Sequence, residues 1–210
     1  MNKRGLLIVI SGPSGAGKGT ICKELLEQNN NLFISVSATT RSPRAGEVDG
    51  VNYHFLSKEE FISRVEKTDF LEHAHVHGNY YGTPRFKVEE MLDQGRDVIL
   101  EIDIQGALKV KENFEEGVFI FILPPSMEEL KNRIIKRGSE TEESLMTRFK
   151  AAYQEINYIS KYNYAVVNDE VDVAVTKIEG IIAAEKCRVD RKKDTVLDSK
   201  EGLIHEQLYD

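Results

Sequence analysis

Residues 12–20 read Gly12-Pro13-Ser14-Gly15-Ala16-Gly17-Lys18-Gly19-Thr20 and lie between an apolar run at residues 6–10 and a helical pattern that begins at residue 17. This order of strand, glycine-rich loop, lysine and helix is typical of a loop that binds nucleotide phosphates. Successive backbone N–H groups and the positive end of the helix dipole attract anions at such a turn. We therefore expect Lys18 to contact the outer phosphates of a nucleoside triphosphate.

The residue after this lysine departs from the usual loop pattern. Ser or Thr normally follows the lysine and binds Mg²⁺. Here Gly19 follows Lys18, and the hydroxyl comes one position later, at Thr20. The loop's ligand to Mg²⁺ is therefore either Thr20 or a water molecule, and the sequence does not choose between them.

The composition excludes several classes of protein. The chain has 210 residues and is 40% hydrophobic, which suffices for one sizeable core with inserted subdomains. A net charge of −7 argues against a protein that wraps nucleic acid. No apolar run approaches the roughly 20 residues of a membrane helix, and no secretory signal is expected before the first strand. Two cysteines far apart, Cys22 and Cys187, suit a reducing compartment, so we expect a cytoplasmic protein.

Strands and helices alternate over most of the chain, which predicts an α/β fold with a parallel sheet flanked by helices. This core is expected to comprise residues 1–34, 84–123 and 161–190. Between residues 35 and 83 strands follow strands, which predicts an inserted mixed α+β lobe. Residues 124–160 are predicted to be helical, and residues 191–210 to form a charged tail.

Individual strands are predicted from short apolar or alternating runs. The predicted strands are residues 6–11, 32–37, 51–56, 70–76, 80–82, 97–103, 118–123 and 165–167. The strand at residues 97–103 ends in the carboxylate of Asp103, on the same predicted face as Glu101. Capping boxes at Ser57 and Ser126 predict two helix starts.

The inserted lobe contains two arginines and two tyrosines that suit a phosphate. Arg41 and Arg44 flank Ser42-Pro43, and Tyr53 and Tyr81 lie on predicted strands. Guanidinium groups form bidentate, charge-assisted bonds with phosphate, and a phenol adds a rigid donor. A solvated loop with two half-buried tyrosines fits the same spacing, so the residue pattern alone leaves both interpretations open.

Four segments together resemble the guanylate kinase family. They are residues 12–18, Ser37-Ala-Thr-Thr-Arg41-Ser-Pro-Arg44-Ala-Gly-Glu47, Gly78-Asn-Tyr-Tyr81-Gly-Thr83 and Ile102-Asp103-Ile-Gln-Gly106. The resemblance runs from residue 5 to residue 187, and the segment at residues 37–47 is far more specific than the phosphate loop. It implies transfer of the γ-phosphate of ATP to GMP with Mg²⁺ as cofactor. It also implies a P-loop core, a GMP-binding lobe at residues 35–83 and a lid within residues 124–160.

The resemblance further implies roles for individual residues. The GMP-binding residues would be Ser37, Arg41, Arg44, Tyr53, Glu72, Tyr81, Thr83 and Asp103, and the ATP-binding residues would be 12–20 together with Asn168. Glu72 has a clear chemical reason, because guanine presents N1–H and N2–H₂ on one edge and a carboxylate accepts both. Adenine has an unprotonated N1 at that edge, and a site of this type can reject the wrong base by about 10⁴-fold.

Phosphoryl transfer requires positive charge between two anions rather than a protein nucleophile. Lys18, Arg41 and Mg²⁺ are expected to supply it, together with arginines of the lid. The lid candidates are Arg133, Arg137 and Arg148, of which the resemblance favours Arg137 and Arg148 as catalytic.

Carboxylates beside the phosphate loop complete the predicted site. Asp103 is expected to hold Mg²⁺ through water. Glu101 either orients an arginine or a bound water, or forms a structural ion pair, and the sequence leaves both open.

Two other functions fit the same frame. One is a kinase of another small phosphorylated acceptor, which Ser37, Glu72 and Thr83 disfavour. The other is a non-catalytic guanylate-kinase-like interaction module, a class that usually lacks the intact loop and lysine present here. We expect ATP and GMP as the partners, no nucleic acid or membrane, and either a monomer or a homodimer.

Overall fold

The computed structural model describes residues 4–76, 78–136 and 142–191. The chain divides into a unit that ends at Val175 and a unit that begins at Thr176, and each is described by itself. In the described residues, no helix combines the length and the apolar character needed to cross a membrane.

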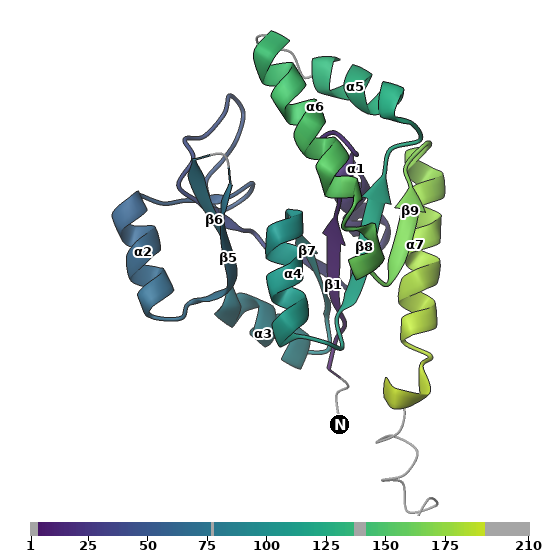
Figure 1. The fold of residues 1–210 in the computed structure, drawn as a ribbon. Coiled ribbons are helices and arrows are strands. Elements are labelled where there is room, and N and C mark those ends of the chain that lie inside the picture. Colours follow the sequence, from purple (N-terminus) through teal and green to yellow (C-terminus); the bar gives the residue numbers. More distant parts are fainter. Residues whose placement is uncertain (1–3, 77, 137–141, 192–210) are drawn as a thin grey trace, which may run out of the picture. The chain divides into compact units, whose positions relative to one another are not determined.

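A five-stranded parallel sheet forms the core of the first unit (Figure 1). Its strands in spatial order are β2 (Leu32–Ile34), β7 (Asp97–Glu101), β1 (Leu7–Ser11), β8 (Val118–Leu123) and β9 (Tyr164–Val167). The central strands β7, β1 and β8 are mostly apolar and buried, because helices cover both faces of a parallel sheet. Because all five strands are parallel, the loop after β1 lies at the carboxyl edge of the sheet, where ligands bind in folds of this class.

Helices flank this sheet, with α4 in front and α1 behind in the view of Figure 1. Those that lie wholly in the first unit are α1 (Lys18–Gln28), α3 (Arg85–Asp93) and α4 (Ile104–Asn113). Along the chain, α7 (Val171–Glu185) follows β9, beginning in the first unit and continuing into the second. One apolar cluster joins Val9 of β1 and Leu100 of β7 to Val88 of α3 and Val110 of α4.

A second, four-stranded sheet lies within the segment predicted as an inserted lobe. Its order is β4 (His54–Phe55), β3 (Ala38–Thr39), β6 (Asn79–Pro84) and β5 (Phe70–Val76). β3 pairs parallel with β4 and antiparallel with β6, so the sheet is mixed. Helix α2 (Lys58–Glu66) begins with the predicted capping box at Ser57 and Glu60, and its buried Phe61 stacks on Phe70.

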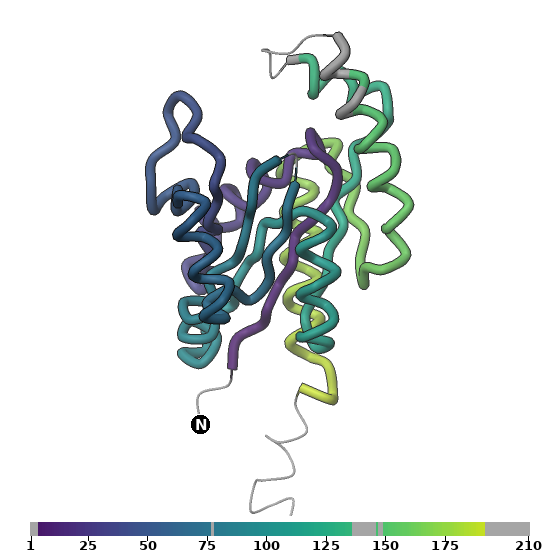
Figure 2. Tube along the Cα trace, turned by 60° about the vertical axis from the view of Figure 1, so that its left-hand side comes forward, coloured from purple at the N-terminus to yellow at the C-terminus, as the bar shows by residue number. Residues whose placement is uncertain are grey.

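Two helices follow β8 in the segment predicted as a lid. α5 (Met127–Lys136) and α6 (Glu142–Ile156) share a small buried cluster of Leu130, Ile134 and Ala152, and a short 3₁₀ helix (Ile159–Lys161) leads to β9. In Figures 1 and 2 these helices stand on one side of the core strands and the second sheet stands on the other.

Several predicted strands are wrong in extent. β2 ends at Ile34 rather than at residue 37, and only His54–Phe55 is a strand within residues 51–56, where Val51 and Asn52 form a turn and Tyr53 makes an isolated bridge with Asp49. The strand predicted at residues 97–103 ends at Glu101, because Asp103 turns out of the sheet and caps α4. The sequence analysis identified no helix at residues 104–113, although α4 contributes to the main core.

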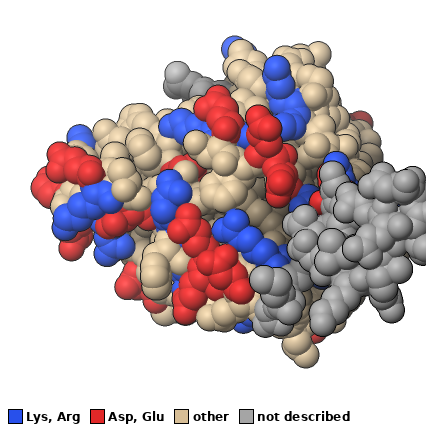
Figure 3. Space-filling model, turned by 90° about the horizontal axis from the view of Figure 1, so that it is seen from below, with Lys and Arg blue, Asp and Glu red and all other residues tan. Residues whose placement is uncertain are grey.

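Acidic and basic side chains are interspersed on the face seen in Figure 3. The part of this face that the structure describes therefore carries no single-sign patch.

Candidate functional site

The phosphate loop turns through glycines in conformations that other residues rarely adopt. Gly12 has a φ of 140°, and a side chain there would lie 2.3 Å from the carbonyl oxygen of Ile122. Gly17 caps α1 in the left-handed region with a φ of 91°. Because α1 starts directly at Lys18, the first N–H groups of the helix face the loop, which is the arrangement that binds phosphate.

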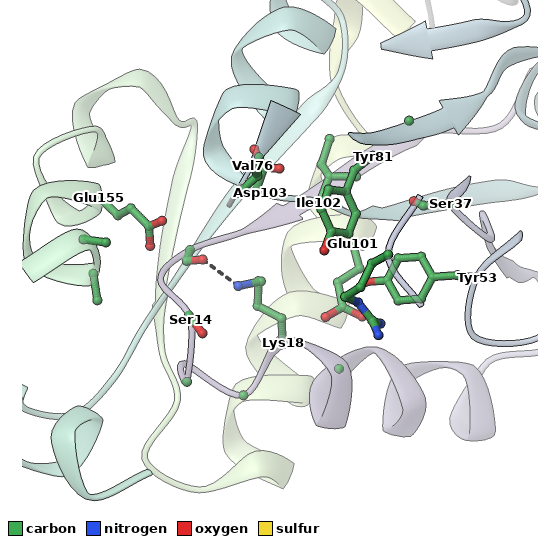
Figure 4. Close-up of a pocket in the computed structure, with 18 of the residues that line it drawn as sticks. Ser14, Lys18, Ser37, Tyr53, Val76, Tyr81, Glu101, Ile102, Asp103 and Glu155 are labelled. Carbon is green, nitrogen blue, oxygen red and sulfur yellow. Dashed lines mark hydrogen bonds between the residues drawn. The ribbon is translucent and has the colours of Figure 1, made fainter. Parts of the chain in front are cut away.

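Lys18 folds back over this loop (Figure 4). Its ammonium group donates to the carbonyl of Gly12 at 2.6 Å and lies 3.2 Å from that of Pro13. Lys18 lines the pocket described below, and its predicted contact with the outer phosphates stays a prediction.

Asn168 supports the loop from below, an arrangement that the sequence did not predict. Its side chain is 3% exposed and donates to the carbonyl of Ala16 at 2.8 Å. The amide nitrogen would lie 2.3 Å from a side chain at position 17, which is a second reason for Gly17. The predicted contact of Asn168 with adenine stays a prediction.

Arg133, one of the lid candidates, has protein partners. It pairs with Glu129 at 2.8 Å and donates to the carbonyl of Asn168 at 3.2 Å. Ser126 caps α5 as predicted, but the carboxylate of Glu129 bonds Arg133. Arg137 lies outside the described residues, and so does the side chain of Arg148, although its backbone belongs to α6.

Gly19 faces the carboxylate of Glu101 beside the loop. A Cβ atom at this position would lie 3.5 Å and 3.6 Å from the two carboxylate oxygens of Glu101. Burial raises the pKa of the neighbouring Cys22 thiol, and the charge of Glu101 raises it further. Thr20 is exposed at the start of α1, whereas Gly19 and Glu101 both line the pocket described below.

Arg41 follows β3 of the second sheet, and its side chain is held by Glu47. Its Nη2 donates to both carboxylate oxygens of Glu47, at 2.9 Å and 3.0 Å, and this hydrogen-bonded ion pair raises the pKa of Arg41 and lowers that of Glu47. The backbone N–H of Arg44 donates to the same carboxylate at 2.7 Å. Glu47 thus ties both phosphate-binding candidates to one turn, a role that the sequence analysis did not assign.

Two aromatic rings stand beside Arg41. The guanidinium lies over the Tyr53 ring at 5.5 Å, and Tyr53 meets Tyr81 edge to face at 6.1 Å (Figure 4). Burial raises the pKa of Tyr53, and the charge of Glu101 adds to the effect, so the phenol is a donor. All four residues whose spacing alone had left a solvated loop possible line one pocket in the structure, although Arg44 is exposed.

Glu72 is a buried carboxylate that the hydroxyl of Thr83 contacts at 2.7 Å. It is 6% exposed, and burial raises its pKa from 4.5 to about 7, with a further contribution from the charge of Asp103. Burial of a carboxylate is costly, and carboxylates with strongly shifted pKa values are concentrated at functional sites. Glu72 and Thr83 come from the paired strands β5 and β6, which fixes their spacing.

Asp103 sits at the start of α4 rather than on a strand. Its carboxylate accepts the backbone N–H of Gly106 at 2.9 Å and so caps the helix. The prediction that Asp103 and Glu101 share one face of a strand is therefore wrong, because Asp103 does not lie on the strand. Both carboxylates nevertheless line one pocket, because the chain turns at Ile102.

One pocket of about 280 Å³ joins these groups, and Figure 4 shows its lining. Predicted site residues on its wall are Gly12, Ser14, Gly15, Gly17, Lys18, Gly19, Ser37, Arg41, Arg44, Tyr53, Glu72, Tyr81 and Asp103. The sequence analysis missed Glu155 of α6, which also lines it. The pocket therefore connects the phosphate loop with the second sheet and with α6, a helix of the predicted lid.

Comparison with known proteins identifies the family of this chain. The guanylate kinase family model matches residues 4–185. The chain belongs to the guanylate kinase family.

Relatives of known name match over the full chain. The guanylate kinase of Clostridium perfringens is 76% identical over 209 residues, which are 100% of this chain and 97% of that protein. That of Clostridium tetani is 74% identical, covering 99% of this chain and 100% of its own. The crystal structure of guanylate kinase from Anaplasma phagocytophilum has a TM-score of 0.79 at 37% identity, over 94% of this chain and 96% of the other. The resemblance to guanylate kinase drawn from four segments is confirmed.

Proposed function

We propose that this chain transfers the γ-phosphate of ATP to GMP and releases ADP and GDP. The observation that carries the proposal is the pocket that Lys18 and the loop glycines share with Arg41, Tyr81 and Glu72. A site for a triphosphate and a site for a purine monophosphate thereby open into the same space. Membership of the guanylate kinase family supports this reaction.

The acceptor would bind through its phosphate and its base. Arg41, Arg44, Tyr53 and Tyr81 supply donors to the phosphate of GMP. Glu72 accepts from N1–H and N2–H₂ of guanine, and Ser37 and Thr83 complete the guanine site. Binding at both ends fixes the distance of the acceptor oxygen from the loop, and positioning of this kind is the main source of rate in phosphoryl transfer.

An oxygen of the GMP phosphate then attacks Pγ, and the bond from Pγ to the β–γ bridging oxygen breaks, so that ADP leaves. No covalent intermediate with the protein is required. Lys18 and Arg41 offset the negative charge, together with the lid arginines Arg137 and Arg148. Closure of the lobe (residues 35–83) and the lid (within 124–160) over the core would exclude water, which otherwise competes for the γ-phosphate.

Mg²⁺ suits the donors found here. Carboxylate oxygens of Asp103 and Glu101 line the pocket, and the space that a side chain at Gly19 would fill lies against Glu101. Asp103 would hold the ion through water, and Thr20 is the alternative hydroxyl ligand. When bound, Mg²⁺ neutralises charge on the β- and γ-phosphates.

The test is ADP production from ATP and Mg²⁺ with GMP, AMP, UMP or CMP supplied separately, for wild type, Lys18→Ala and Glu72→Gln. We expect turnover with GMP alone, its loss in Lys18→Ala, and loss or relaxed base choice in Glu72→Gln. Equal turnover of several acceptors would refute guanine recognition. Absence of turnover with every acceptor would favour an interaction module. A cytoplasmic location and a monomeric or homodimeric state stay predictions from the sequence.

A further inference from the structure

Gly106 is the third residue of α4 and lies buried against the guanine-recognition residue. A Cβ atom at this position would lie 2.7 Å from Oε2 of Glu72 and 3.1 Å from its Cδ. Gly106 belongs to the core helix, whereas Glu72 belongs to β5 of the second sheet. The contact therefore joins the two parts of the first unit at the functional pocket.

The backbone at Gly106 does not itself require glycine. Its φ lies outside the left-handed region, unlike that of Gly12 or Gly17, and its N–H donates to Asp103 as in any capped helix. Glycine in a helix is about 1 kcal/mol less favourable than alanine. The contact that a side chain would meet is the carboxylate of Glu72, so the reason for glycine lies in that carboxylate.

We propose that Gly106 is a positioning residue that sets the orientation of the Glu72 carboxylate and thereby the choice of guanine. The inference rests on the proposed function of Glu72. Thr83 holds Oε1 at 2.7 Å, and the bare face of Gly106 receives Oε2. Both oxygens are needed, because one accepts from N1–H of guanine and the other from N2–H₂.

A methyl group at position 106 would force this carboxylate to move. An ordinary contact needs 3.4 Å or more. A Cβ atom at position 106 would lie only 2.7 Å from Oε2 of Glu72, so this oxygen must move away. The movement would rotate the carboxylate about its hydrogen bond with the Thr83 hydroxyl or break that hydrogen bond. Misplacement by roughly 1 Å can cost about 10²-fold in rate, so we expect a loss of 10- to 100-fold in kcat/KM for GMP.

The experiment compares wild type, Gly106→Ala, Glu72→Asp and the double variant, with Gln105→Ala as a matched control on the exposed neighbouring position. Steady-state kinetics are measured with GMP and with inosine monophosphate, which lacks the 2-amino group. ATP affinity and melting temperature are measured on the same samples.

We expect Gly106→Ala to raise KM for GMP more than it lowers kcat, and to reduce the preference for GMP over inosine monophosphate. ATP affinity should not change, and Gln105→Ala should behave as wild type. The shorter side chain of Glu72→Asp withdraws the carboxylate from position 106. Adding Gly106→Ala to that variant should therefore cost less than it does in wild type.

Unchanged kinetics for GMP in Gly106→Ala would overturn the inference. Equal losses for GMP, inosine monophosphate and ATP would also overturn it, because they indicate general disruption. If Gly106→Ala lowers the melting temperature, the comparison of both single variants with the double variant decides between the two explanations. Losses in kcat/KM for GMP that add up in the double variant refute the coupling, whereas a smaller combined loss supports it. Failure of wild type to use GMP would instead refute the proposed function.

Discussion

Replacing Glu72 by Gln should stabilise the protein while impairing its function. The pKa of this buried carboxyl is raised from 4.5 to about 7, chiefly by burial. The folded protein therefore keeps the proton at pH values where the unfolded chain has lost it. The free energy of unfolding should decline as pH rises from about 4.5 to about 7, and should stop declining above that range.

The size of this effect follows from the pKa change. Each pKa unit corresponds to about 1.4 kcal/mol, so the complete loss is about 3 kcal/mol, of which about 2.5 kcal/mol falls between pH 5 and pH 8. Gln at position 72 keeps the shape and an acceptor for Thr83 but does not titrate. The free energy of unfolding of Glu72→Gln, relative to that of wild type, should therefore increase by about 2 to 3 kcal/mol between pH 5 and pH 8.

Urea denaturation at pH 5, 6, 7 and 8 measures this difference. Glu112→Gln, at an exposed position of α4, serves as the control for removal of one carboxylate. Saturating GMP should stabilise wild type by mass action and leave Glu72→Gln nearly unchanged. A difference between wild type and Glu72→Gln that does not vary with pH would refute the argument that burial of this carboxylate destabilises the unliganded protein.

Two further predictions concern the phosphate loop. Asn168→Ala removes the bond to the carbonyl of Ala16, so it should lower the free energy of unfolding by about 1 to 2 kcal/mol and weaken ATP binding several-fold without changing GMP binding. Urea denaturation and calorimetry check this, and unchanged stability together with unchanged ATP affinity would contradict it. Gly19→Ser places a hydroxyl beside Glu101 and directly after Lys18, where Mg²⁺ usually finds its ligand. ATP binding titrated with Mg²⁺ should reach half-saturation at about five-fold lower Mg²⁺, the equivalent of one hydrogen bond of about 1 kcal/mol, whereas an unchanged requirement would contradict this placement of the ion.

Local patterns sufficed for the elements whose cause is local. The loop at residues 12–20, the capping box at Ser57 and the apolar strand β8 each depend on residues close in sequence. The alternation of strands and helices was enough to predict the parallel sheet. Helix α4 was missed because it follows directly on a strand and its start depends on the turn at Asp103.

The sequence by itself determined the fold class, the phosphate loop and, through segments that resemble guanylate kinase, the family and most candidate site residues. Tertiary structure decided which of these groups meet. Asn168 donates to the carbonyl of Ala16 from 152 positions away, the Glu101 carboxylate lies within van der Waals contact of the side-chain position at Gly19, and Gly106 receives the carboxylate of Glu72. The physical reason is that a spacing along the chain predicts periodic contacts within one element, whereas packing between elements sets the distances at which carboxylates, amides and glycines meet.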